Sequence, residues 1–189
     1  MDLRADDEHS PWRTTSTREV YRNPWITVRE DQVIRPDGSP GIYGVMSASR
    51  AVGVVACTAA DEIVLVGQWR YTLDAYSWEI VEGGSDAGEA PVDAARRELR
   101  EEAGYEAASW STLIDDFVLS NSVTDERATI FVATDLTEVA RDPDPTEILT
   151  VRHVALDTAL AAIDEGVITD SITVAALLML ERRRRTPGS

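Results

Sequence analysis

The chain has 189 residues, enough for one domain with a substantial hydrophobic core and a small extension. Its 34 acidic and 18 basic residues give a formal net charge of −16 at pH 7, which disfavours non-specific binding to nucleic acid or to anionic membranes. We expect a soluble protein, because the acidic start lacks the apolar core of a signal peptide and residues 174–180, the longest C-terminal apolar run, are too few to span a bilayer. The single cysteine, Cys57, excludes an intrachain disulfide, so a reducing cytoplasm is the expected location.

The N-terminal quarter predicts an extension built from antiparallel strands. Residues 1–15 are expected to be disordered, and residues 16–48 to form the extension. Between Glu19 and Met46, the pattern indicates strands that are separated by turns at Asn23-Pro24 and at residues 36–40. The main domain is expected to occupy residues 49–185.

The main domain is predicted to begin with strands. Short β-branched runs at residues 52–57 and 63–66 indicate a hairpin in a core sheet, and Trp78–Val81 is expected to be a strand that enters a turn at Gly83. The elements expected after that turn are a helix over Pro91–Ala103, strands around Trp110–Val118, Thr129–Thr134 and Leu149–Val154, and helices over Leu156–Glu165 and Thr169–Arg184. This order is typical of an α+β fold in which helices are layered on a sheet.

The stretch at residues 83–105, GGSDAGEAPVDAARRELREEAGY, is the most informative part of the chain. Pro91 suits a first helical turn, good helix formers follow, and a glycine ends the helix. On this helix Glu98, Glu101 and Glu102 lie on one face, beside an apolar strip that can pack on a sheet. Three adjacent carboxylates repel one another, whereas a hard divalent cation such as Mg²⁺ or Mn²⁺ turns them into an oxygen-ligand site.

A solvent-exposed helix with ordinary ion pairs, such as Arg97 with Glu101, is the alternative interpretation of this stretch. That interpretation gives no role to the Gly83-Gly84 turn or to Glu89, which precede the helix at fixed distances. A loop that leads into a metal-binding helix does require such a turn. The pattern therefore favours metal-dependent chemistry on a phosphate substrate.

The fixed positions of the stretch are Gly83, Glu89, Arg97-Glu98-Leu99, Glu101-Glu102 and Gly104. They match the Nudix box, and the chain resembles Nudix hydrolases. Less specific similarities at residues 43–45, 67–70, 77–79 and 120–126 extend the resemblance to the branch of ADP-ribose pyrophosphatases and nucleoside diphosphate sugar hydrolases. This resemblance implies a Nudix α/β/α sandwich with a mixed sheet and an N-terminal antiparallel strand extension.

The resemblance also implies roles for the residues of the box. Glu98 and Glu102 would be the principal Mg²⁺ ligands, with Glu101 as a further ligand or water activator. The backbone carbonyl of Glu82 would complete the metal shell. Arg97 would orient the glutamates. An ordinary ion pair between Arg97 and a glutamate of the helix has the same geometry as this orienting contact, because orientation is achieved through such a pair.

Outside the box, the resemblance implies a water-activating residue and a set of substrate-binding residues. In this branch the base can come from a loop, and the sequence offers Glu126 and Glu147. We favour Glu147, because its Pro/Asp-rich loop resembles the mobile acidic loop of the branch. The substrate-binding candidates are Arg70 on phosphate or ribose, Glu79 near the metal ligands, Arg50 and Trp25 as stacking partners of a nucleobase, and Glu126. Trp25 is equally suited to packing.

The implied reaction is Mg²⁺-dependent hydrolysis of the pyrophosphate of a nucleoside diphosphate linked to another group, such as ADP-ribose or a sugar nucleotide. Two positions depart from the pattern: Ser120 stands where ADP-ribose-specific members carry proline, and Tyr105 where the box has an aliphatic residue. Several sugar nucleotides therefore stay open as substrates. The alternatives are a house-cleaning (d)NTP pyrophosphohydrolase and a catalytically silent nucleotide-sugar sensor. Exchange of N-terminal strands in the branch implies a homodimer, with a small nucleotide as substrate and neither nucleic acid nor membrane as partner.

Overall fold

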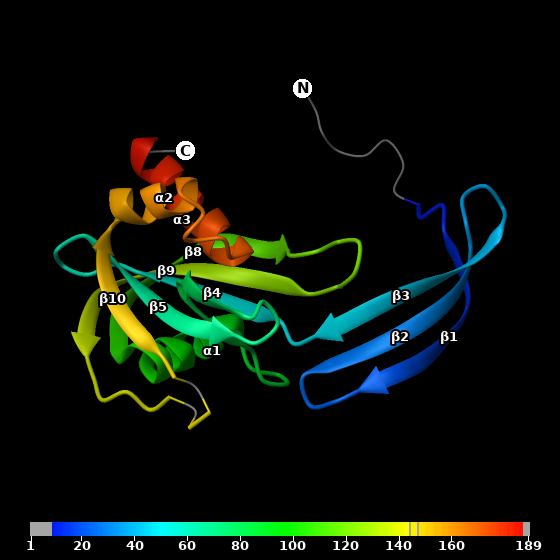
Figure 1. The fold of residues 1–189 in the computed structure, drawn as a ribbon, viewed down its shortest axis with the longest axis horizontal. Helices are drawn as coiled ribbons and strands as arrows, with labels where there is room; N and C mark the ends of the chain where they lie inside the picture. The colour runs from blue at the N-terminus through cyan, green and yellow to red at the C-terminus, as the bar shows by residue number, and fades with distance from the viewer. Residues whose placement is uncertain (1–8, 144, 147, 187–189) are drawn as a thin grey trace. The chain divides into compact units, whose positions relative to one another are not determined.

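The computed structural model describes residues 9–143, 145–146 and 148–186, and they form two compact units (Figure 1). The N-terminal unit comprises the described residues up to Ala48 together with Ser120–Glu126. The main unit comprises Ser49–Leu119 and the described residues from Arg127 onward. Among all of these residues, no helix is both long enough and apolar enough to cross a membrane.

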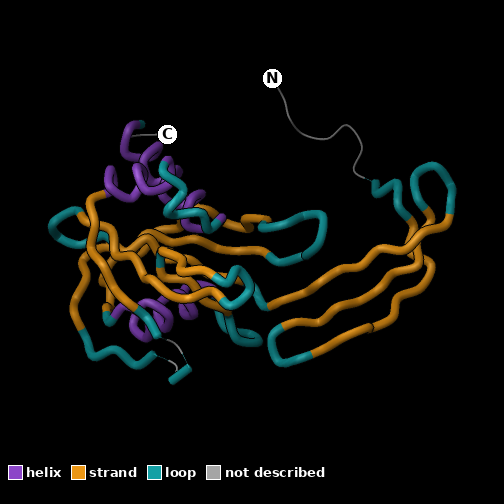
Figure 2. Tube along the Cα trace, viewed as in Figure 1, coloured by secondary structure: helices purple, strands orange, loops and turns teal. Residues whose placement is uncertain are grey.

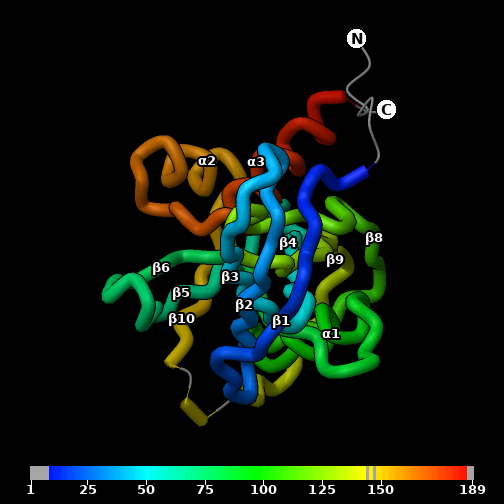
Figure 3. The backbone as a smooth tube through the Cα atoms, turned by 90° about the vertical axis from the view of Figure 1, so that its right-hand side faces the viewer, coloured from blue at the N-terminus to red at the C-terminus, as the bar shows by residue number. Residues whose placement is uncertain are grey.

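The N-terminal unit is an antiparallel sheet of three strands, which run side by side in Figure 3. Strand β1 spans Arg13–Arg22, β2 spans Ile26–Ile34 and β3 spans Pro40–Ala48. Asn23 forms the first turn, because its side-chain oxygen accepts hydrogen bonds from the backbone N–H groups of Trp25 and Ile26, at 2.9 and 2.8 Å. In the second turn Gly38 has a φ of +83°, which favours glycine.

The start of β1 corrects the expectation of disorder for residues 1–15. Arg13 and Thr14 pair with Ile34 and Val33 of β2, so residues 13–15 are strand. The β-branched side chains of Thr14 and Thr15 suit this extended conformation. Residues 1–8 lie outside the described part of the chain.

The segment Ser120–Glu126 groups with β3 although it lies far away in the sequence. The Met46 N–H donates to the Val123 carbonyl at 3.0 Å, and the Asp125 N–H donates to the Met46 carbonyl at 3.3 Å. The Asp125 carboxylate also accepts from Arg29 at 3.2 Å and from Ser47 at 2.8 Å. These bonds fix the segment on the N-terminal sheet.

The main unit contains two sheets between helices (Figure 2). The four-stranded sheet has the order β7-β4-β9-β8, with β7 at Val81–Gly84, β4 at Ala51–Ala56, β9 at Arg127–Glu138 and β8 at Tyr105–Val118. The three-stranded sheet has the order β10-β5-β6, with β10 at Thr150–Ala155, β5 at Glu62–Arg70 and β6 at Ala75–Glu79. Because β4 pairs in parallel with β9 and antiparallel with β7, the predicted mixed sheet is confirmed.

Alternate side chains of the central strands face two different cores, which produces the predicted α/β/α sandwich. Val52 and Val54 pack with the apolar strip of α1, Pro91–Glu98. Val55 faces the other core, which contains side chains of α2, Leu156–Asp164, and α3, Ser171–Arg185. The two C-terminal helices lie close to their predicted positions.

Two predictions about strand pairing were wrong. Residues 52–57 and 63–66 do not form a hairpin in one sheet, since β4 and β5 belong to different sheets and an isolated bridge joins Cys57, just after β4, to Ile63. Both edges of β4 are occupied, by β7 and β9, so β5 pairs elsewhere. The predicted strand Trp78–Val81 is also divided at Ile80, where the chain passes from β6 in one sheet to β7 in the other.

The predicted helix over Pro91–Ala103 is present, but its final turn is wider than an α-helix. Residues Leu99–Ala103 form a π-helical turn directly after α1. Gly104 ends the helix with a φ of +74°, in the left-handed conformation that glycine adopts without strain. π-Turns of this kind occur often at functional sites, and this one contains Glu101 and Glu102.

Candidate active site

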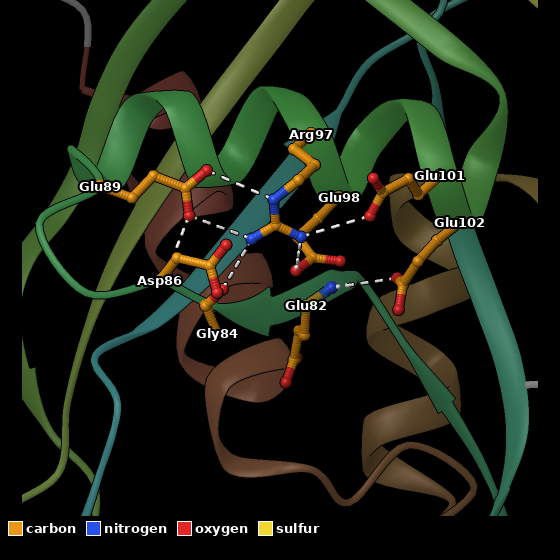
Figure 4. A network of polar contacts seen from close by, with 8 residues as sticks. All are labelled: Glu82, Gly84, Asp86, Glu89, Arg97, Glu98, Glu101 and Glu102. Carbon is orange, nitrogen blue, oxygen red and sulfur yellow. Dashed lines mark hydrogen bonds and ion pairs between the residues drawn. The ribbon is translucent and has the colours of Figure 1, made fainter. Parts of the chain in front are cut away.

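Arg97 is the hub of the polar network in the box (Figure 4). Its Nη1 donates to Glu98 at 2.6 Å and to Glu101 at 3.2 Å. Its Nε and Nη2 form a two-pronged pair with the Glu89 carboxylate, at 3.3 and 3.1 Å. Nη2 also donates to the Gly84 carbonyl at 2.8 Å. One guanidinium thereby connects the turn, the loop and two glutamates of the helix.

Charge complementarity stabilises this arrangement. Hydrogen bonds from Arg97, and then from the Asp86 N–H, lower the pKa of the partly buried Glu89 carboxyl. Hydrogen bonds to Glu89, followed by those to Glu98, raise the pKa of Arg97 further above its ordinary value. Arg97 is therefore permanently charged and offsets part of the repulsion among the box carboxylates.

Gly83 leaves the space that Glu98 occupies. A Cβ built at Gly83 would lie 2.1 Å from the Glu98 Cδ and Oε1, far inside van der Waals contact. A Cβ at the neighbouring Gly84 would meet nothing closer than the Ser49 Cβ, at 3.8 Å. The first glycine of the box therefore leaves room for the Glu98 carboxylate, because it has no side chain.

Glu82 is a second residue of the site that contacts two different elements. Its backbone N–H donates to the Glu102 carboxylate at 3.3 Å, while its own carboxylate accepts from the Thr173 hydroxyl at 2.8 Å. Burial, reinforced by the nearby Asp170 carboxylate, raises the pKa of the Glu82 carboxyl well above its ordinary value. Glu102 itself is 4% exposed.

Arg70 and Glu79 form a second charged pair on the paired strands β5 and β6, where Arg70 lies opposite Ala75 and Glu79 lies opposite Val66. The Arg70 Nε donates to both oxygens of Glu79, at 2.9 and 3.1 Å, and its Nη2 donates to the same carboxylate. Gln68 adds a contact to Glu79 at 3.4 Å. Glu79 is 2% exposed, whereas the Arg70 side chain is 38% exposed. A buried carboxylate thus holds a guanidinium whose outer part reaches solvent.

Arg50 lies at the start of β4 and contacts the strands beside it. Its guanidinium donates to Asp116 at 3.0 Å and to the Thr129 hydroxyl at 3.3 Å. Arg50, followed by Arg127, lowers the pKa of the exposed Asp116 carboxyl. A pocket of about 340 Å³ adjoins Arg50 and the loop at residues 85–89.

The remaining candidates belong to the N-terminal unit or lie outside the described residues. Trp25, 76% exposed, and Glu126 belong to the N-terminal unit. Burial raises the pKa of the Glu126 carboxyl. Glu147, the favoured base, lies outside the described residues.

Two contact residues were missed by the sequence reasoning. Asp116 has a φ of +53° within a break in the register of β8, so the Asp115-Asp116 pair inside a strand was a usable signal for a bulge. Thr173 has no local signal, because its contact with Glu82 joins residues 91 positions apart.

The ligand set fits a hard divalent cation in its chemistry. The box supplies three carboxylates, without imidazole or thiolate. In the described part of the chain, no three such side chains stand close enough to enclose an ion. Arg97 holds Glu98 and Glu101, and Glu102 faces the Glu82 N–H. An ion would therefore have to compete with Arg97 for these oxygens.

Comparisons with known proteins identify the family of the chain. The family model of the NUDIX domain matches residues 48–176, and the model of the nucleoside diphosphate sugar hydrolase N-terminal domain matches residues 12–46. A methanol dehydrogenase activator from Bacillus methanolicus is 34% identical over 171 residues, covering 89% of this chain and 92% of that protein. An ADP-ribose pyrophosphatase from Mycobacterium tuberculosis is 33% identical over 174 residues, covering 90% of this chain and 83% of that protein.

The fold is shared with a solved structure described as an ADP compounds hydrolase. The TM-score is 0.83 at 21% identity, and the match covers 97% of this chain and 99% of that chain. The family model spans well over half of the chain and includes every residue of the box network. The chain therefore belongs to the Nudix hydrolase family.

Proposed function

We propose that this hydrolase cleaves the pyrophosphate bond of a nucleoside diphosphate linked to another group, ADP-ribose or a sugar nucleotide, and releases a mononucleotide and a sugar phosphate. The observation that carries the proposal is the Arg97 hub, which gathers Glu89, Glu98 and Glu101 at the glycine turn. The N-terminal match to nucleoside diphosphate sugar hydrolases supports this substrate class. The mycobacterial relative makes ADP-ribose the first substrate to test.

Nudix hydrolases generally use divalent metal ions, and we assign Mg²⁺ here, with Mn²⁺ as the alternative. Glu98, Glu101, Glu102 and the backbone carbonyl of Glu82 would hold the ion. When bound, it neutralises the diphosphate and lowers the pKa of the attacking water. Arg97 orients the glutamates through the contacts described above.

The residues outside the box bind the substrate and take the proton in this proposal. Glu147 is our candidate base, with Glu101 and Glu126 as the alternatives that a substitution series separates. The solvent-facing part of Arg70 would contact phosphate or ribose, since Glu79 holds the guanidinium in place. Arg50 and Trp25 would stack on the nucleobase.

We also propose a homodimer with exchanged N-terminal strands. Every residue of β1 is exposed, and Val20, Tyr21, Trp25, Ile42 and Tyr43 of this unit present large apolar side chains to solvent. A sheet with so much exposed apolar surface is suited to covering by a second copy. Light scattering of the purified protein gives the molar mass directly, and a monomer would contradict the proposal. Since Cys57 is a buried free thiol, the reducing cytoplasm remains our proposed location.

A substrate panel tests the proposed reaction. The protein is incubated with Mg²⁺ and ADP-ribose, ADP-glucose, GDP-mannose, NADH or dNTPs. The products of the first four are treated with phosphatase and assayed for phosphate, whereas the dNTP reactions are assayed for pyrophosphate, because phosphatase also releases phosphate from intact dNTPs. Release from ADP-ribose or a sugar nucleotide supports the proposal. Turnover of dNTPs alone would favour the house-cleaning activity, and silence with intact Mg²⁺ binding would favour the sensor.

A further inference from the structure

The carboxylate of Glu82 is tied to helix α3, on the other side of the sheet from the box helix. The Thr173 hydroxyl donates to Glu82 Oε1 at 2.8 Å. In Figure 4 the Glu82 side chain extends away from Glu98 and Glu101, while its backbone nitrogen faces Glu102. Glu82 is thus held through its main chain by the box helix and through its side chain by α3.

Thr173 makes a second bond at the point where the chain changes sheets. The Ile80 N–H, between β6 and β7, donates to the Thr173 hydroxyl oxygen at 3.0 Å. Because that oxygen accepts from Ile80, its single proton is available for Glu82. The hydroxyl therefore bonds both Ile80 and Glu82, two residues apart on the segment that leads into the Gly83 turn.

The position of Thr173 is itself fixed. Its side chain is fully buried, and its backbone N–H donates to the Asp170 side chain, the N-cap of α3, at 2.8 Å. A buried hydroxyl with both bonds made is costly to remove, since the partners left behind lose a hydrogen bond in a dry environment. This gives the contact the rigidity that a positioning role requires.

We infer that Thr173 is a positioning residue of the metal site, which acts through Glu82 and holds the backbone from Ile80 to Gly83 in place. The inference depends on the proposed function in one respect, the assignment of the Glu82 carbonyl to the ion. Thr173 has no assigned contact with substrate or ion, so its effect must pass through the segment that it bonds, at Ile80 and Glu82.

Mn²⁺ binding to the substrate-free protein tests the inference, with free Mn²⁺ measured by electron paramagnetic resonance. Thr173→Val keeps the shape of the side chain and removes the hydroxyl. We expect its Kd for Mn²⁺ to rise by roughly 10- to 100-fold, the range typical of residues that orient metal ligands. Thr173→Ser restores the hydroxyl and should bind Mn²⁺ like the wild type.

Thr58→Val is the matched control, because Thr58 also accepts a backbone N–H, that of Glu62 at 3.2 Å, in the β4–β5 turn. Its Mn²⁺ affinity should equal that of the wild type. Glu82→Ala should weaken binding as Thr173→Val does, and adding Thr173→Val to it should weaken binding little further, since coupled residues are not additive. Thermal unfolding of each variant separates loss of fold from loss of binding.

The outcomes distinguish the inference from the proposed function. If the wild type fails to bind Mn²⁺, the metal assignment fails. If the wild type binds and a folded Thr173→Val binds equally well, the inference is overturned, as it is if Thr173→Val and Glu82→Ala act additively. If Thr173→Val does not fold, the Mn²⁺ affinity of Glu82→Ala decides the question. An affinity equal to that of the wild type would overturn the inference.

Discussion

Replacement of Gly83 by alanine should lower kcat about 100-fold while it leaves the fold intact. The added Cβ would lie 2.1 Å from the Glu98 carboxyl, where ordinary contact begins at 3.4 Å. The atoms in its way belong to the end of a flexible side chain, so Glu98 moves and the backbone does not. The displaced carboxylate then leaves its 2.6 Å contact with Arg97.

The expected effect of Gly83→Ala on stability is small, whereas its effect on kcat is large. Alanine restricts the unfolded chain, which stabilises by about 0.4–1 kcal/mol, and the weakened ion pair costs a similar amount. The melting temperature should therefore change by no more than roughly 4 °C. A misplacement of about 1 Å at a catalytic centre can lower the rate on the order of 100-fold, so kcat should fall by about that factor.

Gly84→Ala is the control, because its Cβ would meet only the Ser49 Cβ, at 3.8 Å. Steady-state hydrolysis of ADP-ribose and thermal unfolding are measured for both variants. We expect Gly84→Ala to retain most of the wild-type kcat. A fully active Gly83→Ala would refute the view that catalysis requires a glycine here to make room for the Glu98 side chain.

Four further substitutions test the site. Arg97→Met should lower kcat by roughly 10- to 100-fold, because Glu98 and Glu101 lose their common partner, and an unchanged kcat would exclude an orienting role. Burial raises the pKa of the Glu82 carboxyl, so its contribution to stability is present below the unfolded pKa near 4.5 and is lost as pH rises. In protein freed of metal with EDTA, Glu82→Gln should therefore raise the melting temperature more at pH 8 than at pH 5, and equal shifts would contradict the assignment. Glu147→Gln should lower kcat by about 100- to 10,000-fold, whereas Glu126→Gln should mainly raise KM; the opposite pattern would move the base to Glu126.

Local signals in the sequence predicted most of the elements. Pro91 and Gly104 mark the ends of the box helix, and Asn23 and Gly38 form the turns of the N-terminal sheet. Strand partners were harder to predict, because pairing depends on distant residues. The parallel partner of β4 is β9, more than 70 residues away, and nothing in residues 51–56 specifies it.

In the site, too, contacts between residues close in the sequence could be predicted, whereas contacts between distant residues could not. The spacing predicted Glu98, Glu101 and Glu102 on one helical face and an ion pair of Arg97 with Glu101, and Arg97 contacts both Glu98 and Glu101. Arg70 and Glu79 were each named from the sequence, but their bond also requires β5 to pair with β6 and the Arg70 side chain to reach along the ladder from its partner Ala75 to Glu79. The contact of Thr173 with Glu82 requires the packed fold, since it links α3 to β7 between residues 91 positions apart.

Mg²⁺-dependent hydrolysis of ADP-ribose by the wild type and by Glu102→Gln is the most direct measurement of the central claim. Products are identified by mass spectrometry, with and without Mg²⁺. The account predicts AMP and a ribose phosphate from the wild type with Mg²⁺, and loss of both when Mg²⁺ or the Glu102 carboxylate is removed. Equal turnover by a folded Glu102→Gln, or turnover without divalent ions, would contradict it.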